Sequence, residues 1–301
     1  MLYKHVLGLY RGTLPEAGRV IPGGLQIRDD ISARLEIAMP FVLNGEALEL
    51  VRDLAPESYS EEIILERLRD FRLPHPMSWI EHEHRSEETF ERLGALIRGG
   101  DGEPFMVIPF LEANGMFYEP FCMLVVDHAK NEVSLGINHL VLNAHIEHLF
   151  DLGLDRDQAV RKMEEGKQIF AEIAAMSVVH LRDAVELMGA KNAPMDGRRE
   201  PLMSRQERRA LARKGGETPE AGTQTTRIVL NAEGRAHLTA MRETSDGRPR
   251  RAHWVRGHLM RTPTKGPVWR SAHVRGFGDP IMSPRLVTAA SEGADDPMPS
   301  P

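Results

Sequence analysis

Residues 104–143, PFMVIPFLEANGMFYEPFCMLVVDHAKNEVSLGINHLVLN, decide the fold class of this 301-residue chain. The stretch is rich in Val, Ile, Phe and Met, and two turn signals interrupt it, Asn114-Gly115 and the polar segment 127–131. Asn-Gly favours the tight turn of a hairpin, and runs of β-branched and aromatic residues favour strands. The pattern therefore predicts a β-meander of three strands.

A long amphipathic segment follows the meander. Residues 156–188, RDQAVRKMEEGKQIFAEIAAMSVVHLRDAVELM, place apolar side chains at helical spacing, and Asp155 stands at the position of an N-cap. We expect one helix packed on the sheet, with a break near Gly166 as the alternative. Upstream, Ser58 and Glu61 have the spacing of a capping box, which predicts a helix over 59–72. Together these elements indicate an α+β fold.

The charge of the chain is divided unevenly along its length. The formal net charge is −6, yet residues 1–190 carry −14, residues 191–285 carry +11 and residues 286–301 carry −3. A polar, basic composition with few large apolar side chains is typical of a linker. We therefore expect four parts: an acidic α+β domain over 1–190, a basic polar linker over 191–222, a small basic β module over 223–287 and a disordered tail over 288–301.

Composition also excludes several classes of protein and of site. Cys122 is the single cysteine, so neither an intramolecular disulfide nor a paired-cysteine zinc site can form. The sequence contains no run of about 18 apolar residues, so we expect no membrane helix. The first residues lack the pattern of a secretory signal. We expect a cytoplasmic protein with no membrane partner, no cofactor and no metal site.

Cationic and aromatic side chains crowd two C-terminal segments, RRAHWVRGHLMR at 250–261 and PVWRSAHVRGF at 267–277. Strand side chains alternate between faces, so the two segments, as neighbouring strands, would bring these groups onto one surface. Guanidinium groups pair with phosphate oxygens and indoles stack on bases, which predicts a nucleic-acid-binding surface. The candidate binding residues are Arg251, Trp254, Arg256, His258, Arg261, Trp269, His273 and Arg275.

The same segments contain the parts of a metal-independent ribonuclease. His258 and His273 would exchange protons with the RNA, and Arg256 and Arg275 would hold the charged phosphoryl group. A metal site that uses these histidines and His253 is less favoured, because the nearby arginines repel a cation. Docking onto an acidic protein surface, or self-association, is the other alternative use of the basic part.

The motif RxHxVRGHxxR at 251–261, followed by WxxxHxRG at 269–276, supports a resemblance to known proteins, and LPHPMSWIE at 73–81 adds to it. In these residues the chain resembles a phage- and prophage-associated group of uncharacterised proteins from Gram-negative bacteria. The resemblance implies mobile-element biology, where nucleic-acid binders and modulators of host proteins both occur. We expect binding of RNA or single-stranded DNA, with protein docking as the first alternative and a ribonuclease as the second.

Overall fold

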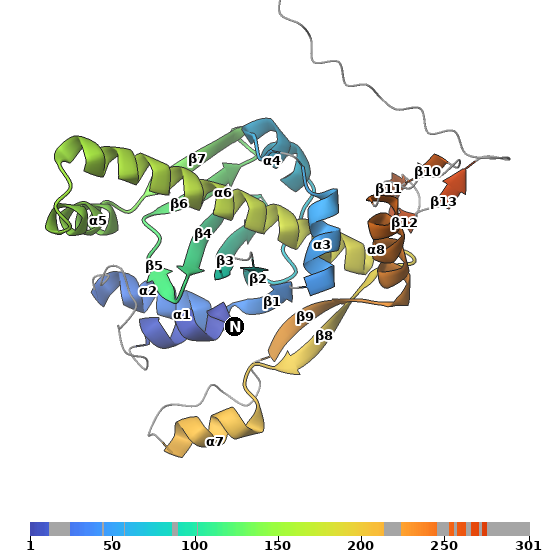
Figure 1. Ribbon diagram of the computed structural model, residues 1–301, viewed down its shortest axis with the longest axis horizontal. Coiled ribbons are helices and arrows are strands. Elements are labelled where there is room, and N and C mark those ends of the chain that lie inside the picture. Colours follow the sequence, from blue (N-terminus) through green and yellow to red (C-terminus); the bar gives the residue numbers. More distant parts are fainter. Residues whose placement is uncertain are drawn as a thin grey trace, which may run out of the picture.

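The computed structural model of the chain describes residues 1–11, 25–43, 45–56, 58–85, 90–100, 102–213, 224–245, 253–255, 258–262, 266–270 and 273–275. These residues form a mixed α+β fold around one large sheet (Figure 1). The order of its strands is β7-β6-β4-β3-β2-β1-β9-β8, and β5 pairs with β4. The strands are β1 Met39–Leu43, β2 Met77–Arg85, β3 Phe90–Gly100, β4 Glu103–Ala113, β5 Met116–Tyr118, β6 Cys122–Asp127, β7 Glu132–Ile137, β8 Met195–Pro201 and β9 Gln224–Leu230.

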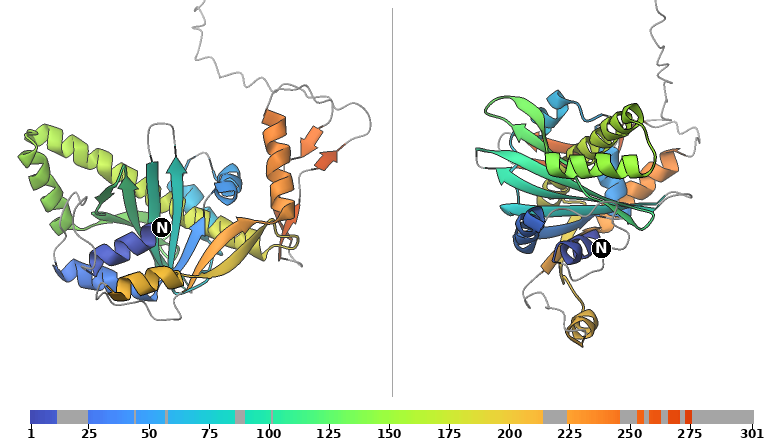
Figure 2. Two further views of the ribbon diagram at one scale, coloured as in Figure 1. Left: turned by 60° about the horizontal axis from the view of Figure 1, so that its bottom comes forward. Right: turned by 90° about the vertical axis from the view of Figure 1, so that its left-hand side faces the viewer.

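Helices cover both faces of this sheet (Figure 2). One face packs against α3 Gly45–Leu54, α4 Glu61–Leu68, α6 Arg156–Gly189 and α8 Ala232–Ser245, and the other packs against α1 Leu2–Tyr10 and α2 Leu25–Ile37. Strand residues alternate between the two cores: Ile80 faces the α6 side and Trp79 faces the α1 side. No described helix is both long and apolar enough to cross a membrane.

Strand β1 joins the two halves of the sheet. It runs parallel to both of its neighbours, so that Phe41 pairs with Ile80 on β2 and with Thr226 on β9. The other strand pairs of the sheet are antiparallel. Pro40 lies near the start of β1, and its carbonyl accepts a hydrogen bond from the Thr225 hydroxyl at 3.3 Å.

The predicted α+β class, the meander and the long helix are confirmed. Strands β4, β6 and β7 are neighbours in the sheet, and the short strand β5 forms a hairpin with β4 across the Asn114-Gly115 turn, where both residues have positive φ. Helix α6 runs without a break through Gly166. Its capping box is complete: the Asp155 carboxylate accepts from the Gln158 backbone N–H at 2.8 Å, and the Gln158 side chain accepts from the Asp155 N–H at 3.0 Å.

The helix predicted over 59–72 is shorter in the structure, spanning Glu61 to Leu68. Its N-cap is Ser60 and not Ser58, since the Ser60 hydroxyl accepts from the Ile63 backbone N–H at 3.5 Å. Tyr59 lies before the helix, and its hydroxyl is 3.3 Å from Nε2 of His180 on α6. This contact joins parts of the chain that are distant in sequence, so the local pattern around the start of α4 does not reveal it.

The domain boundaries predicted near 190 and 223 do not divide the sheet. Strand β8 lies inside the predicted linker and pairs with β9, which belongs to the predicted β module. Strand β9 pairs in turn with β1 of the acidic part. The small β-rich C-terminal part is present, but its strands follow α8: β10 His253–Val255, β11 His258–Thr262, β12 Gly266–Arg270 and β13 His273–Arg275.

Helix α8 was not expected from the sequence. Asn231 caps it, because its side-chain oxygen accepts from the backbone N–H groups of Glu233 and Gly234 at 3.0 and 3.1 Å. Gly234 lets the helix approach the chain at Pro194, where a Cβ would lie 2.2 Å from the Pro194 carbonyl oxygen. Few large apolar residues mark the segment 232–245, so its hydrophobic pattern is weak.

Candidate polyanion-binding surface

The C-terminal strands pair as two separate ladders. Strand β10 pairs with β13, and β11 pairs with β12, both antiparallel. The register opposes Trp254 to Val274 and Val255 to His273, so Trp254 and His273 are one residue out of step. The expectation that Trp254 and His273 share a face of one sheet is therefore wrong in register.

The two histidines proposed for a ribonuclease lie in different ladders. His258 is in β11, opposite Arg270, whereas His273 is in β13. Arg251 and Arg256 fall outside the described residues. Arg261 lies in β11 and Arg275 in β13, so the pairing does not bring the predicted set onto a single ladder.

Trp269 is a core residue. Its side chain is 1% exposed and packs edge-on against His237 of α8, with ring centroids 5.1 Å apart. Its backbone N–H donates to the Lys191 carbonyl at 3.1 Å, which ties β12 to the chain just after α6. Burial also lowers the pKa of His237, so this imidazole is neutral at pH 7. The expectation that the Trp269 indole faces solvent is wrong, because the large apolar ring is buried against α8.

The clearest exposed basic feature lies earlier, in the segment that composition assigned to a linker. We call residues 195–213, which comprise β8 and α7 Arg205–Arg213, the basic arm. Strand β8 is the edge of the sheet next to β9, and α7 extends away from the sheet (Figures 1 and 2). Leu202, which is buried among α1-side core residues, anchors the chain between the two elements.

Arginines of the basic arm point into solvent. On α7, Arg205, Arg209 and Arg213 follow one another at intervals of four residues, which places them on one face of the helix. We call these three residues the arginine stripe. All three are exposed, as are Arg198 and Arg199 on β8. No ion pair joins these five guanidinium groups to an acidic side chain that the structure describes.

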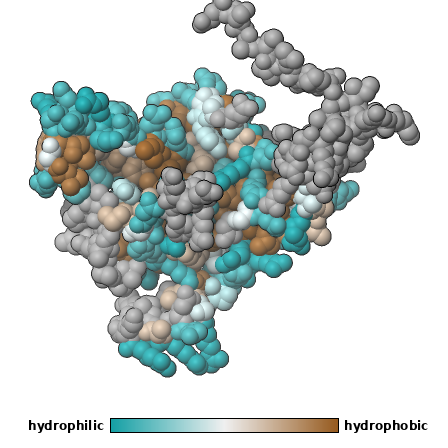
Figure 3. Space-filling model, in the orientation of Figure 1, coloured by the Kyte–Doolittle hydropathy of each residue, from teal (hydrophilic) through white to brown (hydrophobic). Residues whose placement is uncertain are grey.

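The charge of the arm differs from that of the N-terminal part of the chain. Residues 191–213 contain seven basic and three acidic side chains, whereas residues 1–190 carry a net charge of −14. Figure 3 shows the hydrophilic surface of α7 at the lower end of the molecule. On β8, Arg198 is opposed to Arg227, whose guanidinium pairs with Glu200 at 3.2 Å.

The stripe has dimensions that suit a chain of phosphates. Each interval of four residues advances about 6 Å along a helix, so three arginines span about 12 Å. A nucleic-acid strand carries one phosphate per roughly 3.4 Å of helix axis, so the stripe has about the length of three or four phosphates. The i, i+4, i+8 spacing of Arg205, Arg209 and Arg213 was visible in the sequence and could have marked this site. Comparison with protein-family models, with curated proteins and with solved structures found no match to this chain.

Proposed function

We propose that the protein binds nucleic acid, single-stranded RNA or DNA before duplex, through the arginine stripe of α7. The observation that carries this proposal is the presence of three exposed arginines on one helix face that have no described acidic partner. Guanidinium groups are the side chains best suited to bind phosphate oxygens in pairs. A single strand is preferred because the stripe is one residue wide.

The charge distribution supports the same ligand. An acidic body repels a polyanion, so binding is confined to the arm, where the local charge is positive. Arg198 and Arg199 on β8 extend the positive surface toward the sheet. The candidate residues of the C-terminal strands, including Arg261, His273 and Arg275, lie outside the arm and remain a separate prediction.

The test compares two triple variants that lose the same charge. Arg205→Ala, Arg209→Ala and Arg213→Ala remove the stripe, whereas the control removes three other exposed arginines, Arg156 and Arg161 on α6 and Arg69 directly after α4. Fluorescence anisotropy with labelled RNA and DNA oligonucleotides, single-stranded and duplex, measures the affinity from about 50 to 200 mM salt. We expect the stripe variant to bind at least roughly tenfold more weakly, and its salt slope to fall by about 2.

The outcomes separate nucleic acid from an acidic protein partner. Equal binding by the two variants, or no saturable binding by the wild type at the lowest salt, contradicts the proposal. A salt-sensitive dimer in gel filtration, lost in the stripe variant and accompanied by no nucleic-acid binding, would assign the stripe to protein docking instead. Degradation of the RNA by the wild type but not by His258→Ala would support the ribonuclease hypothesis in addition.

A further inference from the structure

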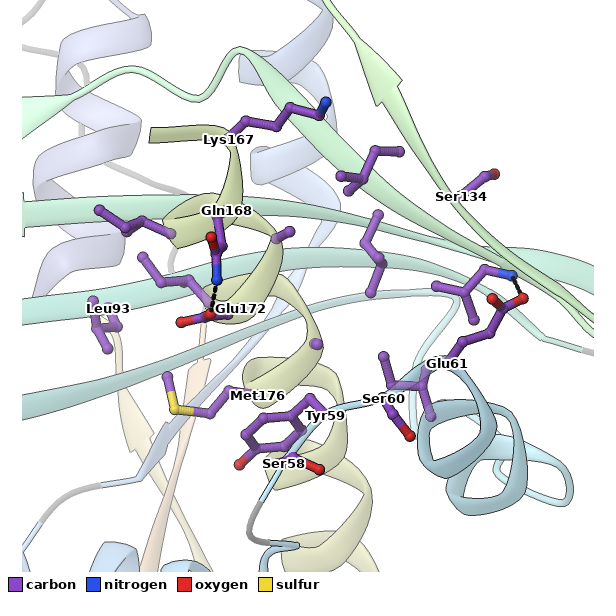
Figure 4. A pocket seen from close by; sticks show the side chains of 18 of the residues that line it. Ser58, Tyr59, Ser60, Glu61, Leu93, Ser134, Lys167, Gln168, Glu172 and Met176 are labelled. Atoms are coloured by element: carbon purple, nitrogen blue, oxygen red, sulfur yellow. Dashed lines mark hydrogen bonds between the residues drawn. The ribbon is translucent and has the colours of Figure 1, made fainter. Parts of the chain in front are cut away.

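A second feature of the molecule lies far from the basic arm, between α6 and the sheet. We call it the α4–α6 groove, a hollow of about 1190 Å³. Its floor is formed by Leu93, Leu111, Leu124, Val133, Leu135 and Ile137 of strands β3, β4, β6 and β7. Helix α6 forms one wall with Ile169, Ile173 and Met176, and the start of α4 forms the other (Figure 4).

The lining of the groove is aliphatic. Leu, Ile, Val, Met and Ala provide most of its side chains, and Tyr59 is the single aromatic residue among the described residues that line it. Ile169 and Ile137 are 49% and 36% exposed, so apolar surface is left open to solvent here. A flat aromatic ligand would find one ring to stack on, whereas a flexible alkyl chain would find aliphatic contacts along the whole floor.

One end of the groove holds a neutral polar pair. Tyr59 lines the groove, and its hydroxyl lies 3.3 Å from Nε2 of His180, which is buried. Burial, and to a lesser degree the charge of Arg52, lower the pKa of His180 to about 4, so its imidazole is neutral at pH 7. Burial and the charge of Asp183 raise the pKa of Tyr59, so the phenol keeps its proton.

This pair leaves Tyr59 free to bind a further polar group. A neutral imidazole carries one proton, and Nδ1 of His180 has no hydrogen-bond partner among the described residues. If the proton is on Nε2, it is donated to the phenol oxygen, and the phenol proton can point into the groove. If it is on Nδ1, the phenol donates to Nε2, and its lone pairs can accept from a ligand.

The rim of the groove selects against an anion. Three carboxylates line it, those of Glu61, Glu91 and Glu172, against the single ammonium group of Lys167. Lys167 is paired with Glu164 at 3.2 Å and lies at the opposite end from Tyr59 (Figure 4). An anionic head group would therefore meet an excess of negative charge.

Strand β7 forms the outer border of the groove and is an edge of the sheet. The Val133 backbone N–H on this edge already donates to the Glu61 carboxylate at 3.0 Å. This bond works against a peptide that would add to β7 as a further strand. The lining and the charges of the groove thus favour a small molecule.

We propose that the α4–α6 groove binds a neutral, single-chain aliphatic molecule whose hydroxyl or carbonyl group hydrogen-bonds to Tyr59. Long-chain alcohols and acyl esters have this chemistry. The alkyl chain lies over the leucines of β4 and β6, and each methylene that it buries tightens binding by about fourfold.

The experiment uses the full chain and isothermal titration calorimetry below the micellar concentration of each probe. The probes are monodecanoylglycerol, monolauroylglycerol and laurate. We expect saturable binding of the glycerides, tighter by roughly tenfold or more for the longer chain, and weaker binding of laurate. Absence of saturable binding, or tighter binding of laurate than of monolauroylglycerol, would overturn the proposal.

Two variants assign the binding to the groove. Met176→Trp fills it, and the matched control, Val160→Trp, adds the same side chain at an exposed position of α6 outside it. We expect Met176→Trp to abolish binding, Val160→Trp to leave it unchanged, and Tyr59→Phe to weaken it by roughly three- to tenfold. Circular dichroism confirms that each variant is folded. Wild-type affinity in a folded Met176→Trp variant would place the ligand elsewhere and refute the assignment.

Discussion

Replacement of Trp269 by alanine tests whether β12 is part of the main body. The indole is 1% exposed, packs against His237 and belongs to the same buried cluster as residues of α3, α6 and β9. Removal of a buried Trp side chain costs about 3–5 kcal/mol. The indole N–H has no hydrogen-bond partner among the described residues, so packing alone sets the cost. We expect the free energy of unfolding to fall by about 4 kcal/mol.

The assay is urea unfolding followed by far-ultraviolet circular dichroism, supported by thermal melts. A loss of this size lowers Tm by roughly 6 °C in a chain of this length. Arg270→Ala is the control, because Arg270 is the exposed neighbour of Trp269, and we expect it to change stability by less than about 0.5 kcal/mol. A wild-type unfolding midpoint for Trp269→Ala would refute the reasoning, since it would mean that β12 folds apart from the core.

Three further predictions concern the main body and are read from urea unfolding. Asp155→Ala removes the capping box of α6 and should cost about 1 kcal/mol, unlike Asp157→Ala in the same first turn. Gly94→Ala places a Cβ 2.5 Å from the ring of Trp79 and should cost about 2 kcal/mol, which wild-type stability would contradict. Burial lowers the pKa of His180 to about 4 in the folded chain, against an ordinary value of 6.5, so the unfolded chain gains a proton first, and stability falls as pH drops from 6.5 toward 4. The loss from this group at pH 5 is roughly 2 kcal/mol, and His180→Gln should remove it.

The elements that could be predicted from the sequence are those with a strong periodic pattern of hydrophobic residues. The Asn114-Gly115 turn, the strands around it and the capped helix α6 each combine a hydrophobic pattern with a local signal at their ends. For these elements the local preference and the buried position agree. Helix α8 lacks such a pattern, because few of its side chains are large and apolar, and it escaped prediction.

Strand β8 shows why composition misplaced the domain boundary. As an edge strand it exposes most of its side chains, and its sequence MDGRREP looks like a polar linker. Backbone hydrogen bonds to β9 hold it in the sheet, and such bonds leave no trace in a hydrophobic pattern. Strand β9 lies in the predicted β module, yet its partner β1 is some 180 residues away in the sequence, so no local signal connects them.

The binding surface predicted on the C-terminal strands stays a prediction, but Trp269 was assigned to the wrong environment, because its side chain is buried. Tryptophan serves equally as a stacking surface for bases and as a core residue, and the sequence PVWR does not distinguish the two. The contact with His237 depends on α8, the helix that the sequence did not reveal. An error in one element thus became an error in the site.

The basic arm has an explanation that requires no ligand, and it accounts for only part of the arm. Charged side chains on an edge strand prevent pairing with another sheet, which is a sufficient reason for Arg198 and Arg199 on β8. It does not apply to α7, which is a helix and offers no strand edge for pairing. Three arginines at intervals of four residues also repel one another, which destabilises a short helix unless an anion lies between them. The stripe therefore lowers the stability of α7 in the unbound protein, and a bound polyphosphate would restore it. We expect α7 to gain helical structure when nucleic acid binds.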